Sequence, residues 1–178
     1  MPADITVVDD FLPEEQFKIV KDLFYHPQTT WYIASGISDA DQTMNELNPL
    51  DNWYMVHTIY NEYAPKSNAW DEVAGIFIPK IKERLGIQYK CLTRIKANCY
   101  PHTKEIQEHP FHSDSFDTVG LMGALFSLNT CDGYTAFTDG TKVDSVANRM
   151  LFFDATQKHH STSTSNAPQR MNINFNFL

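Results

Sequence analysis

The chain has few cysteines, no long apolar run and no signal-like start, and each shortage excludes a class of protein. Cys91, Cys99 and Cys131 are odd in number and form no CxxC pair. A disulfide framework is therefore not expected, and a reducing cytoplasm is the predicted setting. No apolar stretch has the length of a membrane span, and no basic region followed by an apolar one stands at the N-terminus. We therefore expect no membrane association.

Basic residues are also scarce. Lys and Arg number 14 against 22 Asp and Glu, which gives a formal net charge of −8. Binding to a nucleic-acid backbone needs clustered cations, so strong nucleic-acid binding is not expected, although a local basic groove stays possible. With 178 residues, 42% hydrophobic and 20% charged, the sequence is typical of one globular domain, residues 1–178.

Residues 1–88 are expected to support that domain with helices. A strand is predicted over residues 5–8. A helix follows from Leu12-Pro13-Glu14-Glu15 and ends before Pro27. A second helix is predicted over about residues 70–85, closed by Gly86, with a kink or break at Pro79. Between the helices, residues 30–68 are rich in Trp and Tyr, and we expect a strand over residues 53–60 and loop elsewhere.

Residues 89–178 change to short strands separated by turns, such as Cys131-Asp132-Gly133 and Asp139-Gly140. This pattern predicts a mainly β fold with flanking helices, built on an antiparallel sandwich or jelly-roll core. The predicted strands cover residues 89–100, 112–115, 121–128, 135–137, 142–144, 150–153 and 170–178.

The final run alternates strictly, with Arg170, Asn172, Asn174 and Asn176 on one face and Met171, Ile173, Phe175 and Phe177 on the other. A polar face of this kind either meets water or lines a polar cavity. Alternation alone leaves both possibilities open.

His112, Asp114 and His159 form the most informative pattern. Residues two apart on an extended segment point the same way, so His112 and Asp114 can reach one metal ion, which His159 joins from another strand. Two imidazoles and one carboxylate suit a non-haem Fe(II) site that keeps open positions. Arg170 follows and provides a charged fork for a ligand carboxylate. A strand-end salt bridge is the alternative for Arg170.

These residues and their flanking sequences resemble the Fe(II)/2-oxoglutarate-dependent oxygenases, within them the prolyl-4-hydroxylase-like branch and its small phage-encoded members. The resemblance covers about residues 89–178 and is weak over residues 30–68. It rests on His112-x-Asp114, His159, Arg170 and the phrases Arg94-Ile95-Lys96-Ala97-Asn98-x-Tyr100-Pro101, Gly133-Tyr134-Thr135-x-Phe137, Asn148-Arg149-x-Leu151-Phe152-Phe153-Asp154 and Asn172-Ile173-Asn174-Phe175-Asn176.

The resemblance implies a double-stranded β-helix (jelly-roll, cupin-like) core over residues 89–178. His112, Asp114 and His159 would bind Fe(II), and Arg170 would grip the distal carboxylate of 2-oxoglutarate. Asn98, Tyr100 and Asn172 would flank that cosubstrate, although a core role for Tyr100 is equally open. His160 is a rival for His159. We favour His159 because Asp154 precedes it by five positions and Arg170 follows it by eleven.

The function so implied is 2-oxoglutarate- and O2-dependent hydroxylation, with ascorbate as a stimulant, of a prolyl-type peptide, another protein or a small molecule. For a phage-encoded chain the setting would be the host cytoplasm. Residues 31–63 are expected to form a substrate-facing lid. Two alternatives are a Zn-dependent enzyme without redox chemistry and a non-catalytic jelly-roll binding module. The sequence leaves the oligomeric state open.

Overall fold

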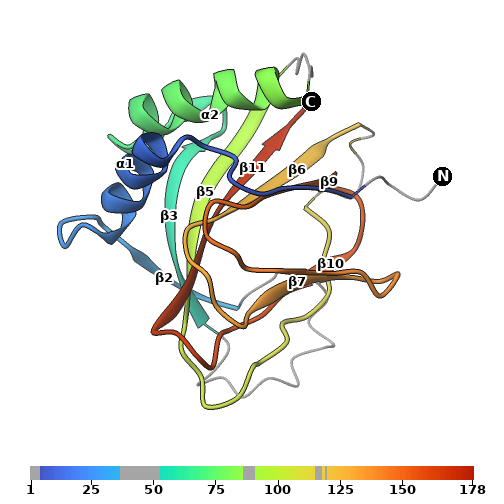
Figure 1. Cartoon of the computed structure of the whole chain (residues 1–178). Coiled ribbons are helices and arrows are strands. Elements are labelled where there is room, and N and C mark those ends of the chain that lie inside the picture. Colours follow the sequence, from blue (N-terminus) through green and yellow to red (C-terminus); the bar gives the residue numbers. More distant parts are fainter. Residues whose placement is uncertain (1–4, 37–52, 86–90, 115–117, 119) are drawn as a thin grey trace.

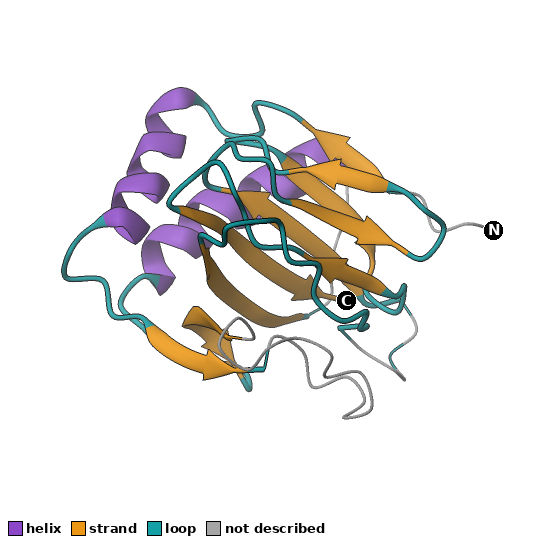
Figure 2. Ribbon diagram, turned by 90° about the horizontal axis from the view of Figure 1, so that it is seen from below, coloured by secondary structure: helices purple, strands orange, loops and turns teal. Residues whose placement is uncertain are grey.

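The computed structural model describes residues 5–36, 53–85, 91–114, 118 and 120–178. Two helices lie on one side of a large antiparallel sheet, and a small sheet lies on its other side (Figure 1). Figure 2 shows the two helices together as a layer beside the strands. No described helix is long and apolar enough to cross a membrane.

The large sheet runs in the order β1-β9-β6-β11-β5-β3-β2, and β4 pairs with β3. Its strands are β1 (Thr6–Val8), β2 (Tyr32–Ser35), β3 (Trp53–Asn61), β4 (Ala64–Pro65), β5 (Leu92–Pro101), β6 (Met122–Ser127), β9 (Met150–Asp154) and β11 (Gln169–Phe177). The small sheet has the order β10-β7-β8, from β7 (Tyr134–Phe137), β8 (Lys142–Asp144) and β10 (His159–Ser161). The described part of the first 88 residues thus contributes four strands as well as two helices.

The helices bury their apolar faces on the large sheet. Helix α1 (Glu14–Tyr25) begins after Pro13 and buries Phe17, Val20 and Phe24. Helix α2 (Trp70–Leu85) carries Phe77, whose ring lies 4.8 Å from the rings of Phe126 and Phe175. Burial of aromatic side chains of this size supplies much of the hydrophobic stabilisation of a core.

Helix α2 continues through Pro79, so the break considered from the sequence is absent. Proline removes one backbone hydrogen bond and disfavours the turn before it. Here Val73 and Phe77 on one side and Ile81 on the other are all buried against the sheet, and this packing keeps the helix continuous. Gly86, the expected helix end, lies outside the described residues.

Two sequence predictions need correction. Residues 32–35 and 64–65 form strands β2 and β4, whereas loop was expected, because pairing with β3 overrides a weak local pattern. Residues 112–114 are not a strand: His112 makes an isolated bridge to His159, and Ser115 lies outside the described residues. The other predicted strands are present with bounds shifted by at most three residues.

Strand β11 is buried on both faces, and this decides the question left open by its alternation. Met171, Ile173, Phe175 and Phe177 join the core under the helices. The opposite face carries polar side chains that are at most 8% exposed: Arg170, Asn172, Asn174 and Asn176. They face the small sheet, where a second apolar cluster of Phe137, Val143, Leu151 and Phe153 joins the two sheets. The polar face therefore lines an interior and does not meet water.

Candidate metal centre

The three predicted ligands lie together between the two sheets. His112 exchanges two backbone hydrogen bonds with His159 on β10, both 2.8 Å, and the Asp114 amide donates to the Ala155 carbonyl at 3.0 Å. One ligand atom from each of His112, Asp114 and His159 lies within 4.8 Å of the others. No further group of three or more His, Cys, Asp or Glu side chains comes this close within the part of the chain that the structure describes.

His160, the rival ligand, lies elsewhere. Its ring packs edge-on against Phe111 at 4.5 Å and faces Tyr134 at 6.2 Å. His159 instead packs near His112, with ring centroids 4.6 Å apart. Successive side chains of a strand point to opposite faces, which separates these neighbours as the sequence predicted.

Both clustered histidines have a ring nitrogen available for a metal. His112 Nδ1 lies 3.4 Å from the Pro110 carbonyl and His159 Nδ1 lies 3.0 Å from the Gln157 carbonyl. A carbonyl only accepts, so each Nδ1 donates and Nε2 keeps its lone pair in the neutral ring. Burial, with the nearby His159, lowers the pKa of His112 to about 4 despite the opposing effect of Asp114. The neutral imidazole that a metal requires is therefore the resting form at neutral pH.

Asp114 stays ionised although it is buried. Burial alone would raise the pKa of its carboxyl group, but the Arg94 guanidinium, the His159 ring and the Asn176 amide together lower it to about 2. Arg94 Nη2 lies 3.0 Å from Asp114 Oδ1. The pairing of Arg94 with Asp114 was not predicted from the sequence.

Arg170 lies 1% exposed on β11. It donates to the Thr162 carbonyl at 3.1 Å and to Thr135 Oγ1 at 2.9 Å, and its guanidinium lies 5.7 Å from the centre of the Tyr100 ring. Its Nε has no hydrogen-bond partner, and no described carboxylate forms an ion pair with it. Burial lowers its pKa. The strand-end salt bridge considered from the sequence is thus not found within the described ranges.

A narrow cavity is lined by His112 and His159, two of the three potential ligands, and by Tyr100 and Thr135, which contact Arg170. Its lining comprises Asn98, Tyr100, His112, Leu125, Thr135, Phe153, His159, Ser161, Asn172 and Asn174. The predicted cosubstrate neighbours Asn98, Tyr100 and Asn172 are all among them, and Asn98 Nδ2 donates to Asn172 Oδ1 at 2.9 Å. The cavity measures about 30 Å3, which suits a water molecule. A five-carbon diacid would require lining side chains to move apart.

Sequence reasoning also missed Ser161 and His109. Ser161 lines the cavity two residues after His159, on the same side of β10. His109 is only 4% exposed, and its Nδ1 lies 2.7 Å from Ser161 Oγ. Burial, with the nearby Arg170, lowers the pKa of His109 to about 3. The offset of two from His159 was the available signal for Ser161; no local pattern marks His109.

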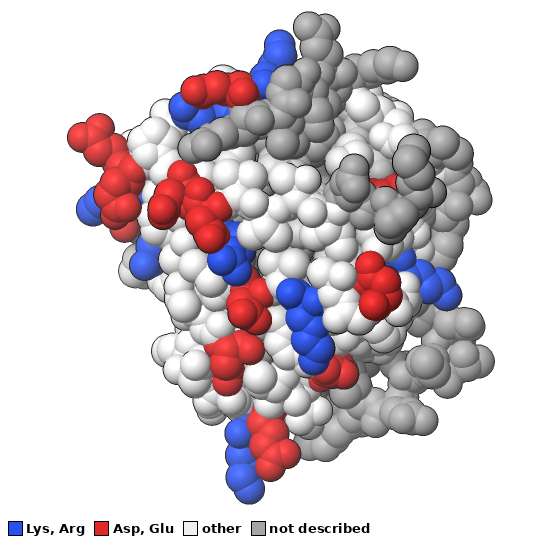
Figure 3. All heavy atoms as spheres, turned by 45° about the vertical axis from the view of Figure 1, so that its right-hand side comes forward, with Lys and Arg blue, Asp and Glu red and all other residues white. Residues whose placement is uncertain are grey.

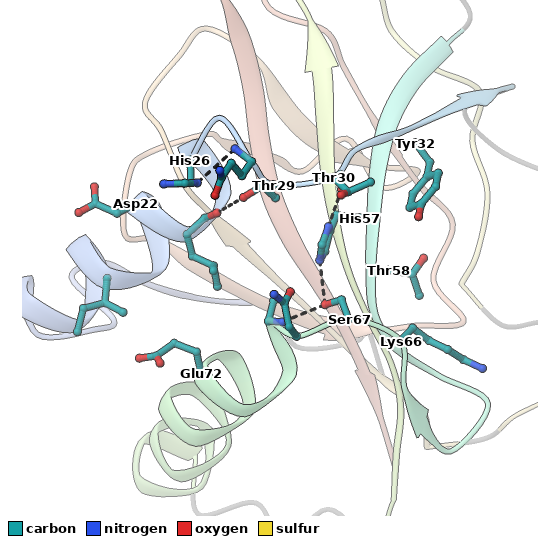
Figure 4. A pocket seen from close by; sticks show the side chains of 15 residues that line it. Asp22, His26, Thr29, Thr30, Tyr32, His57, Thr58, Lys66, Ser67 and Glu72 are labelled. Carbon is teal, nitrogen blue, oxygen red and sulfur yellow. Dashed lines mark hydrogen bonds between the residues drawn. The ribbon is translucent and has the colours of Figure 1, made fainter.

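A larger cavity, of about 700 Å3, lies on the helix side of the sheet and does not contain these residues (Figure 4). Its walls come from the end of α1, from β3 and from the start of α2. His57 lies in it with both ring nitrogens occupied, by the Thr30 carbonyl at 2.7 Å and by Ser67 Oγ at 2.9 Å. The larger cavity is thus separate from the cluster of potential metal ligands, so cavity volume alone does not locate the candidate metal centre.

The architecture matches solved structures along almost the whole chain. A prolyl hydroxylase from Trichoplax adhaerens, in complex with a hypoxia inducible factor oxygen degradation domain peptide fragment, superposes with a TM-score of 0.65 at 16% identity, covering 98% of this chain and 83% of that one. A 2OG-Fe(II) oxygenase family protein from Burkholderia pseudomallei gives 0.67 at 9% identity, covering 97% and 84%. The fold is that of the 2-oxoglutarate- and Fe(II)-dependent oxygenases.

This oxygenase fold confirms the predicted jelly-roll core. It also occurs in the non-heme alpha ketoglutarate dependent carbocyclase SnoK from nogalamycin biosynthesis, with a TM-score of 0.69 at 11% identity, covering 98% of this chain and 79% of that one. No protein-family model and no curated protein matches the sequence.

The donor set fits the metal and the cosubstrate that go with the oxygenase fold. Two imidazoles and one carboxylate suit Fe(II) and leave positions open. The buried guanidinium of Arg170 has an unpaired Nε and lies against Tyr100 and Thr135 of the cavity lining, an arrangement that suits a carboxylate. A Cβ at position 133 would lie 2.6 Å from Arg170 Cδ and from the Ser163 carbonyl oxygen, so Gly133 is required for the close packing around this arginine.

Proposed function

We propose that this protein is a 2-oxoglutarate-dependent Fe(II) dioxygenase that hydroxylates a protein or peptide substrate of the prolyl type. One observation carries the proposal. A single cavity is lined by His112 and His159 of the ligand cluster and also by Tyr100 and Thr135. Arg170, which is buried and has no described carboxylate partner, contacts both Tyr100 and Thr135. A buried cation is costly unless an anion pairs with it, which supports an anionic ligand beside Arg170.

Each residue has a defined task in this proposal. His112, Asp114 and His159 hold Fe(II), and Arg170 binds the distal carboxylate of 2-oxoglutarate through a charged fork that fixes its orientation. Tyr100 and Thr135 shape the subsite around that carboxylate. When bound, the metal and cosubstrate supply the oxidising power for C–H hydroxylation; the protein supplies orientation and exclusion of water.

The substrate class rests on separate grounds. The resemblance points to the prolyl-4-hydroxylase branch, and a Trichoplax prolyl hydroxylase shares the fold. Acidic and basic side chains are interspersed on the face in Figure 3, without a continuous basic patch among its described residues. A polyanionic substrate would draw its affinity from clustered cations. Because the carbocyclase SnoK has the same fold, the fold by itself does not select proline hydroxylation.

Three points stay predictions. The described parts of the expected lid contain strands β2 and β3, and residues 37–52 lie outside the described residues. Cytoplasmic location accords with the free thiols of Cys91, Cys99 and Cys131, and phage origin rests on the resemblance alone. Stimulation by ascorbate is a property expected of the branch.

The deciding experiment measures succinate release from 2-oxoglutarate with Fe(II) and O2, with proline-containing peptides, free amino acids and oligonucleotides as candidate substrates. We expect turnover that peptides stimulate and that His112→Ala abolishes. No succinate release under any condition, or equal release when Zn(II) replaces Fe(II), would contradict the dioxygenase assignment. Stimulation by oligonucleotides alone would contradict the substrate class while leaving the reaction type intact.

A further inference from the structure

We infer that Arg94 and Asn176 are positioning residues which fix the Asp114 carboxylate for metal binding. The inference rests on the proposed function, because it takes Asp114 as a ligand of the metal. The interaction is a closed ring of three side chains. Arg94 Nη2 donates to Asp114 Oδ1 at 3.0 Å, Asn176 Nδ2 donates to Asp114 Oδ2 at 2.9 Å, and Arg94 Nε donates to Asn176 Oδ1 at 2.9 Å.

The ring is built on rigid neighbouring strands. Arg94 on β5 and Asn176 on β11 are directly paired in the register of the large sheet. Asn176 is 2% exposed, and the Arg94 side chain is 31% exposed. Packing and strand pairing limit the motion of both backbones, so the two side chains present their donors from a fixed platform.

Asp114 itself lacks such support. It belongs to no strand, and its backbone amide is held by a hydrogen bond to the Ala155 carbonyl. A short carboxylate on an irregular segment keeps its rotamer freedom unless its oxygen atoms are tethered. The ring tethers both oxygens from the sheet, which explains why the side chain is 5% exposed and points at the histidines.

The pattern of hydrogen bonds also selects the donor oxygen. Asp114 Oδ2 accepts from Asn176 and, at 3.3 Å, from Asn174 Nδ2, whereas Oδ1 accepts from Arg94. A carboxylate oxygen offers two lone pairs. Oδ2 is therefore occupied at both, and Oδ1 keeps one, so the structure assigns Oδ1 as the single oxygen that Asp114 offers to the metal.

Arg94 exerts two opposing effects on a metal ion. Its hydrogen bonds orient the carboxylate, which favours binding, while its positive charge repels a cation. Substitutions that conserve charge isolate the first effect, so Arg94→Lys and Asn176→Ala are the informative variants. Residues behind metal ligands typically change metal affinity by about 10- to 100-fold when they are replaced. Because each substitution opens the same ring, we expect the double variant to bind the metal only slightly more weakly than whichever single variant binds it less tightly.

The experiment is an anaerobic titration of the full chain with Co(II), followed by visible absorption. We expect about 10- to 100-fold weaker binding and an altered cobalt spectrum in both single variants. The matched control is Arg149→Lys, which changes another Arg–Asp pair, with Asp9 at the surface, and should leave both readouts unchanged. Circular dichroism establishes folding. If Asn176→Ala fails to fold, Arg94→Lys carries the test, because its partly exposed side chain tolerates replacement.

The outcomes separate the two proposals. Wild-type affinity and spectrum in a folded Arg94→Lys, together with loss of Co(II) binding in Asp114→Ala, would overturn the positioning role and leave the metal centre intact. Unchanged Co(II) binding in Asp114→Ala would show that the metal centre itself is wrong.

Discussion

Replacing Arg170 by Met separates the stability of the fold from its affinity for a cosubstrate. The guanidinium is buried and has no described anionic partner, a situation that costs several kcal/mol and that Met relieves. The substitution also leaves the Thr162 carbonyl and Thr135 Oγ1 without their hydrogen-bond donor, which lowers the free energy of unfolding by about 1 to 3 kcal/mol for each acceptor. These effects nearly cancel, so we expect the free energy of unfolding without ligand to change by less than about 2 kcal/mol.

Ligand binding should respond very differently. In the wild type, 2-oxoglutarate at 100 times its Kd should raise the free energy of unfolding by about 2.7 kcal/mol, through mass action. Arg170→Met should remove this stabilisation, because no other lysine or arginine of the described chain is buried. Urea unfolding under nitrogen, with Fe(II) and with or without 2-oxoglutarate, measures both quantities. Arg149→Met serves as the control, because it removes an arginine whose partner Asp9 lies at the surface.

Two results would refute this reasoning. A fall of more than about 4 kcal/mol without ligand would mean that Arg170 is mainly structural, since the lost hydrogen bonds alone would then outweigh relief of the buried charge. Full stabilisation of Arg170→Met by 2-oxoglutarate would remove the guanidinium from the cosubstrate site.

Three other perturbations test the metal cluster, a loop anchor and acid stability. His159→Ala should abolish Fe(II) binding in an anaerobic titration, whereas His160→Ala should weaken it by no more than about tenfold; the reverse order would exchange their roles. Asn148 bonds both the amide and the carbonyl of Leu12 at 2.9 and 2.8 Å, so Asn148→Ala should lower the free energy of unfolding by about 2 to 4 kcal/mol in urea, and a change below 0.5 kcal/mol would contradict this. Burial opposes ionisation of Asp132, but hydrogen bonds from Ser165 and Thr164 lower its pKa to about 2. The stabilisation that this carboxylate gives the folded state is therefore present above its ordinary pKa and is lost as the pH falls to 2. Asp132→Asn should flatten the curve of unfolding free energy against pH between pH 4 and 2 and leave its shape at pH 6 to 8 unchanged.

The sequence predicted those parts of the site that local pattern determines. The offset of two placed His112 and Asp114 together, and the alternation of the final run placed Arg170 on the polar face of β11. The partner of Asp114 could not be predicted in this way. Arg94 lies twenty residues away, and its contact with Asp114 depends on the register of β5 against β11 and on the path of an irregular segment. Neither the strand register nor the path of that segment produces a periodic pattern in the sequence.

Strand register therefore couples the stability of this fold to the geometry of its site. Strand β11 carries Arg170 near one end and Asn176 near the other, about 20 Å apart at a rise of about 3.3 Å per residue. A slip of one residue against β5 would turn Arg170 and Asn176 toward the helices and expose Met171 and Phe175 to the polar cavity. The aromatic packing of Phe175 on Phe77 opposes such a slip. The apolar face of β11 thus keeps Arg170, the proposed carboxylate anchor, and Asn176, the proposed tether of Asp114, at a fixed separation.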